Sequence, residues 1–242
     1  MKACVVISAR GQPNIARAIG SVFAQRHEDW VCVVIGKAEI KNFLAADKRV
    51  IHLEHDGTTC EKHEVGLRYA MEHADFWTTL RPEDWFQTYK LVFDNLAMQT
   101  EGAVFGPFIT MQNREVKSGE AMVMGNSPLS NSMRRFVLRG VPAISWANVA
   151  IRTDILKSLP ALLDPRVREY PYVLLNMRVA QQTRWVWRGE VGGTLYIAPE
   201  AKDFPAIWAG RMTVDVTAIE DPPEMEPFFQ RDYLEACRVF LG

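Results

Sequence analysis

The sequence is short of cysteine, of long apolar runs and of excess charge. Its four cysteines form no CxxC pair, and Cys4 and Cys32 lie inside apolar runs, so we expect core thiols rather than disulfides or a zinc site. No apolar stretch reaches the roughly 18 residues needed to cross a bilayer. The formal net charge of −1 excludes a strong overall attraction to nucleic acid or an anionic membrane, although a local basic groove would still fit.

The amino terminus also lacks a targeting signal. Residues 1–3 lead directly into a strand-like run, so we expect no signal peptide and a cytoplasmic protein without a transmembrane segment. The chain does have length and apolar content. Its 242 residues, 48% of them hydrophobic, are enough for one large domain or two small ones with a full core.

Residues 3–35 show the pattern of a strand, a helix and a second strand. The runs 3–8 and 30–35 are continuously apolar and β-branched, which is typical of strands buried on both faces. Between them, apolar residues from Ile15 to Phe23 recur at helical spacing. We therefore predict a βαβ unit with a right-handed crossover, in which residues 3–7 and 31–35 are adjacent parallel central strands.

The alternation of strand and helix continues through the first hundred residues. We predict strands at 49–53 and 76–80 and helices near 40–46 and 62–71. A further helix, from Glu83 to about Met98, is predicted to bury the apolar residues Trp85, Phe86, Tyr89, Leu91, Val92 and Leu96. Such alternation predicts an α/β fold with a mostly parallel central sheet flanked by helices.

The second half is less regular. Residues 103–111, 143–151 and 184–187 have the pattern of strands, and 117–131 that of a loop. Helices are predicted at 154–163 and 172–182, the first capped by Thr153 or Asp154.

Two neighbouring carboxylates, Glu83 and Asp84, follow the predicted strand 76–80. Ligands collect at the carboxyl ends of strands in α/β sheets, and paired carboxylates there can hold a divalent cation that in turn holds a phosphate. The alternative is an ordinary helix start, because Pro82 suits a first helical turn and acids there complement the helix dipole.

These segments resemble the family 2 glycosyltransferases, which have the nucleotide-sugar-binding GT-A fold. The resemblance covers residues 3–97 and continues more weakly to about residue 199. Five stretches carry it in the family's order: 5–13, 18–25 with its Ser-Val-x-x-Gln end, 31–35, the helix around 62–70 with Gly66, and 80–85 in place of the family's Leu-Asp-x-Asp-Asp motif.

The resemblance implies transfer of a sugar from a nucleoside-diphosphate sugar to an acceptor hydroxyl, with Mn or Mg as the divalent cation. It divides the chain into a nucleotide-sugar-binding half, 1–100, an acceptor-binding half of the same domain, 101–202, and a C-terminal tail, 203–242. It implies a metal at Glu83 and Asp84 and a catalytic base at Glu169. Together with the strand-end rule, it makes the following residues nucleotide or donor contacts: Ser8, Arg10, Gly36, Lys37, Asp56, Lys62, Arg81, Gln181, Arg184 and Trp185.

The last three of these residues fit a separate pattern. Residues 181–185 match the Gln-x-x-Arg-Trp pattern of processive family 2 synthases, where it helps to hold the acceptor sugar and the diphosphate. Those enzymes carry membrane helices, and the alternative for this stretch is an ordinary junction between a helix and a strand.

The sequence departs from the family at its acidic positions. Gly36 and Lys37 stand where the family has an aspartate pair, and Arg81 replaces the first aspartate of the metal motif. Arg81 or Lys37 could therefore supply part of the metal's charge, since a cation paired with phosphate does similar electrostatic work.

Two further classes of function stay open. One is a noncatalytic GT-A-like domain that binds a sugar nucleotide or a protein. The other is a transferase acting on a modified nucleic-acid base, on which some of the seven tryptophans would stack. The sequence leaves the acceptor open between a saccharide, a lipid-linked molecule, a protein and a nucleic acid.

Overall fold

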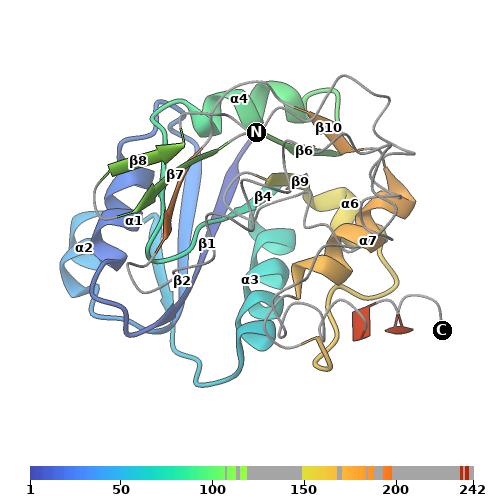
Figure 1. The fold of residues 1–242 in the computed structure, drawn as a ribbon, viewed down its shortest axis with the longest axis horizontal. Helices are drawn as coiled ribbons and strands as arrows, with labels where there is room; N and C mark the ends of the chain where they lie inside the picture. Colours follow the sequence, from blue (N-terminus) through green and yellow to red (C-terminus); the bar gives the residue numbers. More distant parts are fainter. Residues whose placement is uncertain are drawn as a thin grey trace.

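A computed structural model shows how the elements of the 242-residue chain are arranged (Figure 1). A seven-stranded sheet lies between two groups of helices, and a smaller four-stranded sheet lies beside it. The structure describes residues 1–106, 108–112, 115–118, 149–167, 171–183, 185–187, 193–197, 235–236 and 238–239.

The large sheet has the strand order β10-β6-β9-β4-β1-β2-β3. Strand β9 is antiparallel to both of its neighbours, and the other pairs in this sheet are parallel. The predicted fold class, a mostly parallel α/β sheet, is therefore confirmed. Its strands are β1 (Ala3–Arg10), β2 (Trp30–Lys37), β3 (Val50–Leu53), β4 (Phe76–Thr79), β6 (Ala103–Phe105), β9 (Val149–Arg152) and β10 (Trp185–Trp187).

Strand β1 is an interior strand of this sheet, with β4 on one side and β2 on the other. It pairs in parallel with β2 along its whole length, from Ala3 opposite Trp30 to Arg10 opposite Lys37. Its first half also pairs in parallel with β4. The residues from Ala3 to Ile7 are 0% exposed, as expected for a strand covered on both faces. The predicted βαβ unit, with adjacent central strands, is confirmed.

Successive side chains of β1 supply two separate cores, because neighbouring strand residues point to opposite faces. Cys4 and Val6 pack with α3 and α7, whereas Val5 and Ile7 pack with α1 and α4. In Figure 1, α3, α6 and α7 accordingly lie on the opposite side of β1 and β2 from α1 and α2. The helices are α1 (Ile15–Phe23), α2 (Lys41–Ala46), α3 (Thr59–His73), α4 (Lys90–Met98), α6 (Thr153–Ser158) and α7 (Tyr172–Gln182).

The prediction of a long helix beginning at Glu83 is wrong for the first half of that segment. Trp85 and Phe86 form a short strand, β5 (Trp85–Phe86), which pairs with residues 193–194 of the small sheet, and α4 begins only at Lys90. Tyr89 and Leu96, predicted to be buried, are 53% and 61% exposed. Pairing with a strand more than a hundred residues away in the sequence determines the structure of this segment, although the local pattern is helical.

The small sheet also corrects the prediction of a single strand at residues 103–111. The predicted strand 103–111 divides into β6 of the large sheet and β7 (Phe108–Gln112) of the small one. The small sheet has the order β5-β11-β7-β8, with β8 (Glu115–Ser118) and β11 (Gly193–Ile197) as its other members.

The remaining elements lie near the predicted positions, but their bounds differ: β1, β2 and α3 are longer than predicted, and residues 143–148 of the predicted strand 143–151 lie outside the described residues. Helix α7 has the predicted bounds, but α6 ends at Ser158 and has Arg152 as its N-cap, without a side-chain cap. The predicted caps are therefore wrong: the Thr153 hydroxyl donates instead to the carbonyl of Ala74 at 2.9 Å. Cys4, Cys32 and Cys60 are buried free thiols, as expected, and Cys237 lies outside the described residues. Within the part of the chain that the structure describes, no helix has the length and apolar character needed to cross a membrane.

A buried ion pair joins α4 to the centre of the sheet. Lys90 and Asp94 are both 0% exposed and pair with each other. The Lys90 ammonium also donates to the Thr78 hydroxyl of β4 at 2.9 Å and to the Val149 carbonyl of β9 at 3.4 Å. Because a buried charge is stabilised only by close partners, this pair determines where α4 lies on β4 and β9.

We expect Lys90→Met to lower the free energy of unfolding by about 3–5 kcal/mol, because it removes the cation that faces the buried Asp94 carboxylate. Urea denaturation measures this loss. Lys90→Met/Asp94→Leu should recover most of it, since buried pairs are often replaced by apolar residues at little cost. Arg152→Met, which breaks the exposed pair with Asp154, should cost less than about 1 kcal/mol. A loss that small for Lys90→Met as well would contradict the assigned role.

Candidate functional site

The carboxyl ends of β1 and β2 meet at one edge of the sheet, where each strand ends in a cation. Arg10 and Lys37 are the last residues of their strands and lie opposite each other, and both side chains are exposed. The backbone N–H of Gly11 donates to the Lys37 carbonyl at 2.7 Å, which holds the two ends together. Parallel pairing therefore places two positive charges on one edge of the sheet.

Gly36 is required where β2 ends. Its φ angle is +102°, a conformation that favours glycine. A Cβ atom there would lie 2.4 Å from the carbonyl oxygen of Ala9 and 2.9 Å from the Lys62 Nζ. The absence of a side chain at Gly36 thus lets the α3 lysine approach the end of β1.

Lys62 adds a third cation at this edge. It is 6% exposed, and its ammonium donates to the Ala9 carbonyl at 3.0 Å. Burial, followed by the charge of Arg10, lowers the pKa of Lys62, whereas Asp56 acts to raise it. We call Arg10, Lys37 and Lys62 the strand-end cations.

Helix α3 begins beside these cations. Its N-cap is Thr58, which forms a capping box with Glu61: the Thr58 backbone N–H donates to the Glu61 carboxylate at 2.6 Å. The Arg10 guanidinium donates to the hydroxyl of Thr59 in the first turn. The helix N-terminus adds partial positive charge, so this edge of the sheet favours an anion.

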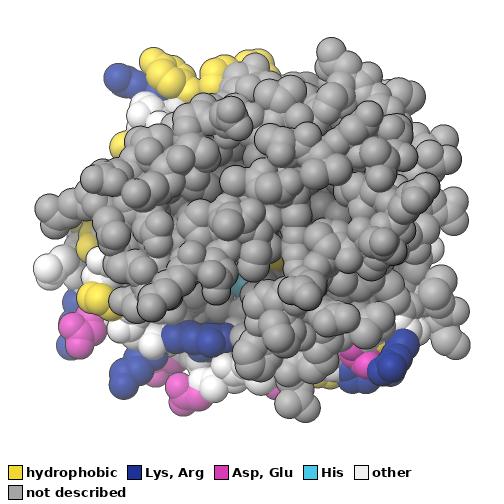
Figure 2. All heavy atoms as spheres, in the orientation of Figure 1, with side chains coloured by type: hydrophobic (Ala, Val, Ile, Leu, Met, Phe, Trp, Pro, Cys, Tyr) yellow, Lys and Arg dark blue, Asp and Glu magenta, His cyan; other side chains and the backbone are white. Residues whose placement is uncertain are grey.

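The space-filling view shows charged side chains of both signs along this edge (Figure 2). Lys and Arg side chains, with Asp and Glu among them, lie along the lower edge of the face. That is the edge at which β1 and β2 end and α3 begins in Figure 1. Of the predicted contacts at this edge, Ser8 is half-buried in β1, and Asp56 is exposed in the loop before α3.

His63, next to Lys62, is a buried neutral side chain that the sequence analysis did not select. It is 8% exposed, and burial, helped by the charge of Arg10, lowers its pKa to about 3. Since the unfolded chain takes up this proton near pH 6.5, the unfolded state binds more protons than the folded state between those values. This histidine therefore makes folding less favourable as the pH falls from about 6.5 to about 3.

We expect His63→Gln to reduce the dependence of the unfolding free energy on pH in that window, by up to about 1.4 kcal/mol per pH unit. Urea denaturation at a series of pH values measures the slope for both proteins. The control is His73→Gln, at a histidine that is 47% exposed near the end of the same helix. Parallel curves for wild type and His63→Gln would contradict the assignment.

The segment after β4 continues beside β1. The backbone N–H of Leu80 and the hydroxyl of Thr79 both donate to the Val6 carbonyl, at 3.0 and 2.9 Å. The next residue, Arg81, donates two parallel hydrogen bonds to the Asp84 carboxylate: from Nε to Oδ2 at 2.7 Å and from Nη2 to Oδ1 at 2.9 Å. The Asp84 side chain is 0% exposed, and that of Arg81 is 46% exposed.

This geometry does not fit a metal ion shared by Glu83 and Asp84. Both carboxylate oxygens of Asp84 accept bonds from the Arg81 guanidinium, and the carboxylate is fully buried. Glu83 is half-buried. Among the described residues, no group of three or more His, Cys, Asp or Glu side chains is arranged to hold a metal. The metal stays a prediction, and the ion pair weighs against it.

The start of α7 lies within electrostatic reach of Arg81. Desolvation, the largest single cause, lowers the pKa of the Arg81 guanidinium, but Asp84, and after it Glu83 and Tyr172, together raise it by more. Tyr172 is the first residue of α7. Thus the start of α7 lies near the segment that follows β4. The predicted base, Glu169, precedes α7 and lies outside the described residues.

Two residues of the predicted Gln-x-x-Arg-Trp pattern, Gln181 and Trp185, lie in different environments. Gln181 is exposed in the last turn of α7, whereas Trp185 of β10 is 1% exposed. The Trp185 indole donates to the Asn176 carbonyl at 3.4 Å and packs edge-on against Phe105. Three strands separate β10 from β1, so Trp185 packs in the core away from the strand-end cations. Arg184 lies outside the described residues.

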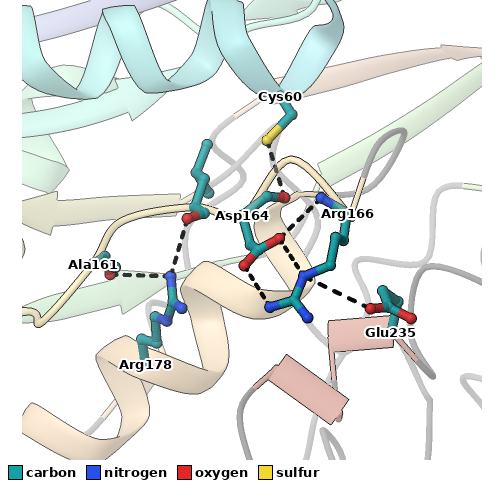
Figure 3. Close-up of polar contacts among 7 residues, drawn as sticks. Cys60, Ala161, Asp164, Arg166, Arg178 and Glu235 are labelled. Carbon is teal, nitrogen blue, oxygen red and sulfur yellow. Dashed lines mark hydrogen bonds and ion pairs between the residues drawn. The ribbon is translucent and has the colours of Figure 1, made fainter. Parts of the chain in front are cut away.

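A polar cluster that the sequence analysis missed ties the loop after α6 to its neighbours (Figure 3). The carboxylate of Asp164 accepts two bonds from the Arg166 guanidinium, each 2.9 Å, and Arg166 also lies 3.9 Å from Glu235. The Cys60 thiol of α3 donates to the Asp164 carbonyl at 3.4 Å, and Arg178 of α7 donates to loop carbonyls. The Asp-x-Arg spacing in the sequence could have predicted the pair of Asp164 and Arg166, because Asp47 and Arg49, at the same spacing, also form an ion pair.

Comparison with solved structures gives likenesses that extend over most of the chain. S. aureus TarS in complex with UDP matches with a TM-score of 0.62 and 14% identity, over 100% of this chain and 72% of that one. Another TarS structure gives a TM-score of 0.64 at 14% identity, over 90% of this chain and only 41% of that one. The mannosyltransferase PcManGT from Pyrobaculum calidifontis, in complex with GDP-Man and Mn2+, gives 0.55 at 12% identity, over 97% and 69%.

These likenesses identify the fold. No protein-family model matches the sequence, and neither does any curated protein. The chain spans less than half the length of the TarS chain that gives the TM-score of 0.64. With identities of 12–14%, the agreement lies in the course of the backbone. The fold of this chain is that of the GT-A glycosyltransferases, as the sequence resemblance predicted.

Proposed function

We propose that this chain binds a nucleoside-diphosphate sugar over the carboxyl ends of β1 and β2 and transfers its sugar to an acceptor hydroxyl. One observation carries the proposal: Arg10, Lys37 and Lys62 converge on the edge of a GT-A sheet where ligands of open α/β folds bind. The likeness to structures holding UDP and GDP-Man supports a nucleotide donor.

The strand-end cations suit the charge that develops during sugar transfer. When the bond between sugar and diphosphate breaks, the leaving diphosphate gains negative charge, which fixed positive groups stabilise. Lys62 is held in place by the Ala9 carbonyl, and Arg10 by Thr59. Because these cations are positioned before the ligand arrives, little reorganisation is needed as the charge develops.

The acceptor hydroxyl would be activated by a carboxylate. In our proposal Glu169 removes the proton of the attacking hydroxyl, as a positioned carboxylate can. The proximity of Tyr172, at the start of α7, to Arg81 supports a place for this segment beside the donor. The division into a donor half, 1–100, an acceptor half, 101–202, and a tail, 203–242, belongs to the same proposal.

We expect a nucleoside-diphosphate sugar to raise the thermal unfolding midpoint of the protein. At a ligand concentration about 100 times Kd, binding adds about 2.7 kcal/mol, which corresponds to roughly 5–10 °C for a chain of this size. UDP-GlcNAc and GDP-mannose are the first ligands to screen, by differential scanning fluorimetry. Absence of any shift across a wider set of nucleotide sugars would rule the proposal out.

Arg10→Ala and Lys62→Met test the site itself. Each should weaken binding of the stabilising nucleotide sugar by about ten-fold or more, the typical worth of a charge-assisted bond. Titration calorimetry gives the affinities. Arg68→Ala is the matched control, because Arg68 is an exposed cation farther along α3 that pairs with Glu64. Equal affinities for all these variants would place the ligand elsewhere, and binding without turnover or hydrolysis would favour a noncatalytic binding domain.

A further inference from the structure

Arg81 occupies the place where the sequence resemblance implied a metal ion. It follows β4, whose last residues are bonded to β1, and β1 ends in Arg10. Its guanidinium is oriented by two bonds to Asp84. The Asp84 carboxylate is 0% exposed, whereas the Arg81 side chain is 46% exposed. A buried acid thus fixes a cation that still reaches the surface.

The chemistry of a guanidinium suits a diphosphate. Arg carries five N–H donors in a rigid fork, so a guanidinium that pairs with a carboxylate on one edge can bond to phosphate oxygens on another. It remains charged at every pH of interest, and the pKa of Arg81 is raised further by Asp84. Arginine forms bidentate pairs with phosphate as well as with carboxylate.

A metal ion would have to displace this arrangement. A metal that takes the Asp84 lone pairs now bonded to Arg81 would have to displace the guanidinium and reach a carboxylate that is fully buried. The displaced guanidinium would then stand beside a divalent cation, and like charges at such distances repel strongly. The carboxylate therefore favours the guanidinium that it already holds.

We propose that the Arg81 guanidinium, held by Asp84, contacts the diphosphate of the donor in place of a divalent cation, so that this chain binds nucleoside diphosphates without a metal. This inference rests on the proposed function, because it assumes a nucleotide at the strand-end cations. Asp84 is a positioning residue: it orients Arg81 and does not contact the ligand.

The first test uses the wild-type protein and needs no variant. UDP and GDP are titrated into the protein by calorimetry, once with EDTA and once with Mn2+ in excess. We expect the Kd of the better ligand to agree within about two-fold between the two conditions. An affinity that falls about ten-fold or more in EDTA and returns with Mn2+ would overturn the inference and leave the proposed function intact. If no nucleoside diphosphate, from UDP and GDP through the wider set of the thermal screen, binds in either condition, both are overturned.

The second test removes the cation without leaving a buried charge. Arg81→Gln/Asp84→Asn replaces the ion pair by two amides of similar shape, which avoids the cost of a lone buried carboxylate. We expect its Kd for the same nucleotide in EDTA to be about ten-fold weaker or more, and Mn2+ should not restore it. Wild-type affinity in this variant would overturn the inference.

A matched control pair lies at the opposite edge of the sheet. Arg49 and Asp47 form another arginine–aspartate pair, with three bonds from the guanidinium to the carboxylate, just before β3 at the amino ends of the parallel strands. Arg49→Gln/Asp47→Asn should leave the nucleotide affinity unchanged. Neither double variant changes the net charge, so an equal loss in both would assign the effect to a general disturbance of the fold and so overturn the role of Arg81.

Discussion

The parallel pairing of β1 with a strand on each side is the constraint on which the rest of the structure depends. Parallel strands need crossover connections, so helices must cover both faces of the sheet. The alternating side chains of β1 accordingly supply one core with Cys4 and Val6 and the other with Val5 and Ile7. The same pairing aligns the carboxyl ends of the strands. Cations separated by many residues in sequence therefore meet at one edge, and that edge is the candidate site.

Two cations of this edge stand where the family that the sequence resembles has acids. Lys37 is the last residue of β2 and Arg81 follows β4, at positions where that family has aspartates. The substitutions are consistent with each other, because each adds positive charge where a diphosphate would lie. Asp84 remains, but its function in this arrangement differs: it accepts two bonds from Arg81. In our proposal, side chains supply the charge complementarity to a diphosphate, and the buried Asp84 carboxylate keeps Arg81 in place.

Much of the fold could be predicted from the sequence, because the buried strands 3–8 and 30–35 carry a strong local pattern. The fold also shows what local patterns cannot predict. Residues 85–86 pair with β11, and nothing within this segment of the sequence indicates so distant a partner. At the site, Arg10, Gly36 and Lys37 followed from the strand-end rule. The buried state of His63 and the pairing of Lys90 with Asp94 depend on tertiary packing, and charged residues at helical spacing usually indicate a solvated face.

The central claim is that a nucleoside diphosphate lies over the ends of β1, β2 and β4, held by side-chain cations. A crystal structure of the protein with UDP, grown in the presence of EDTA, would test it most directly. Our account predicts phosphate oxygens within hydrogen-bond distance of Lys62 and Arg81, with the bonds between Arg81 and Asp84 intact. A nucleotide bound away from this edge, or an Asp84 carboxylate released from Arg81 and turned toward the diphosphate, would contradict it.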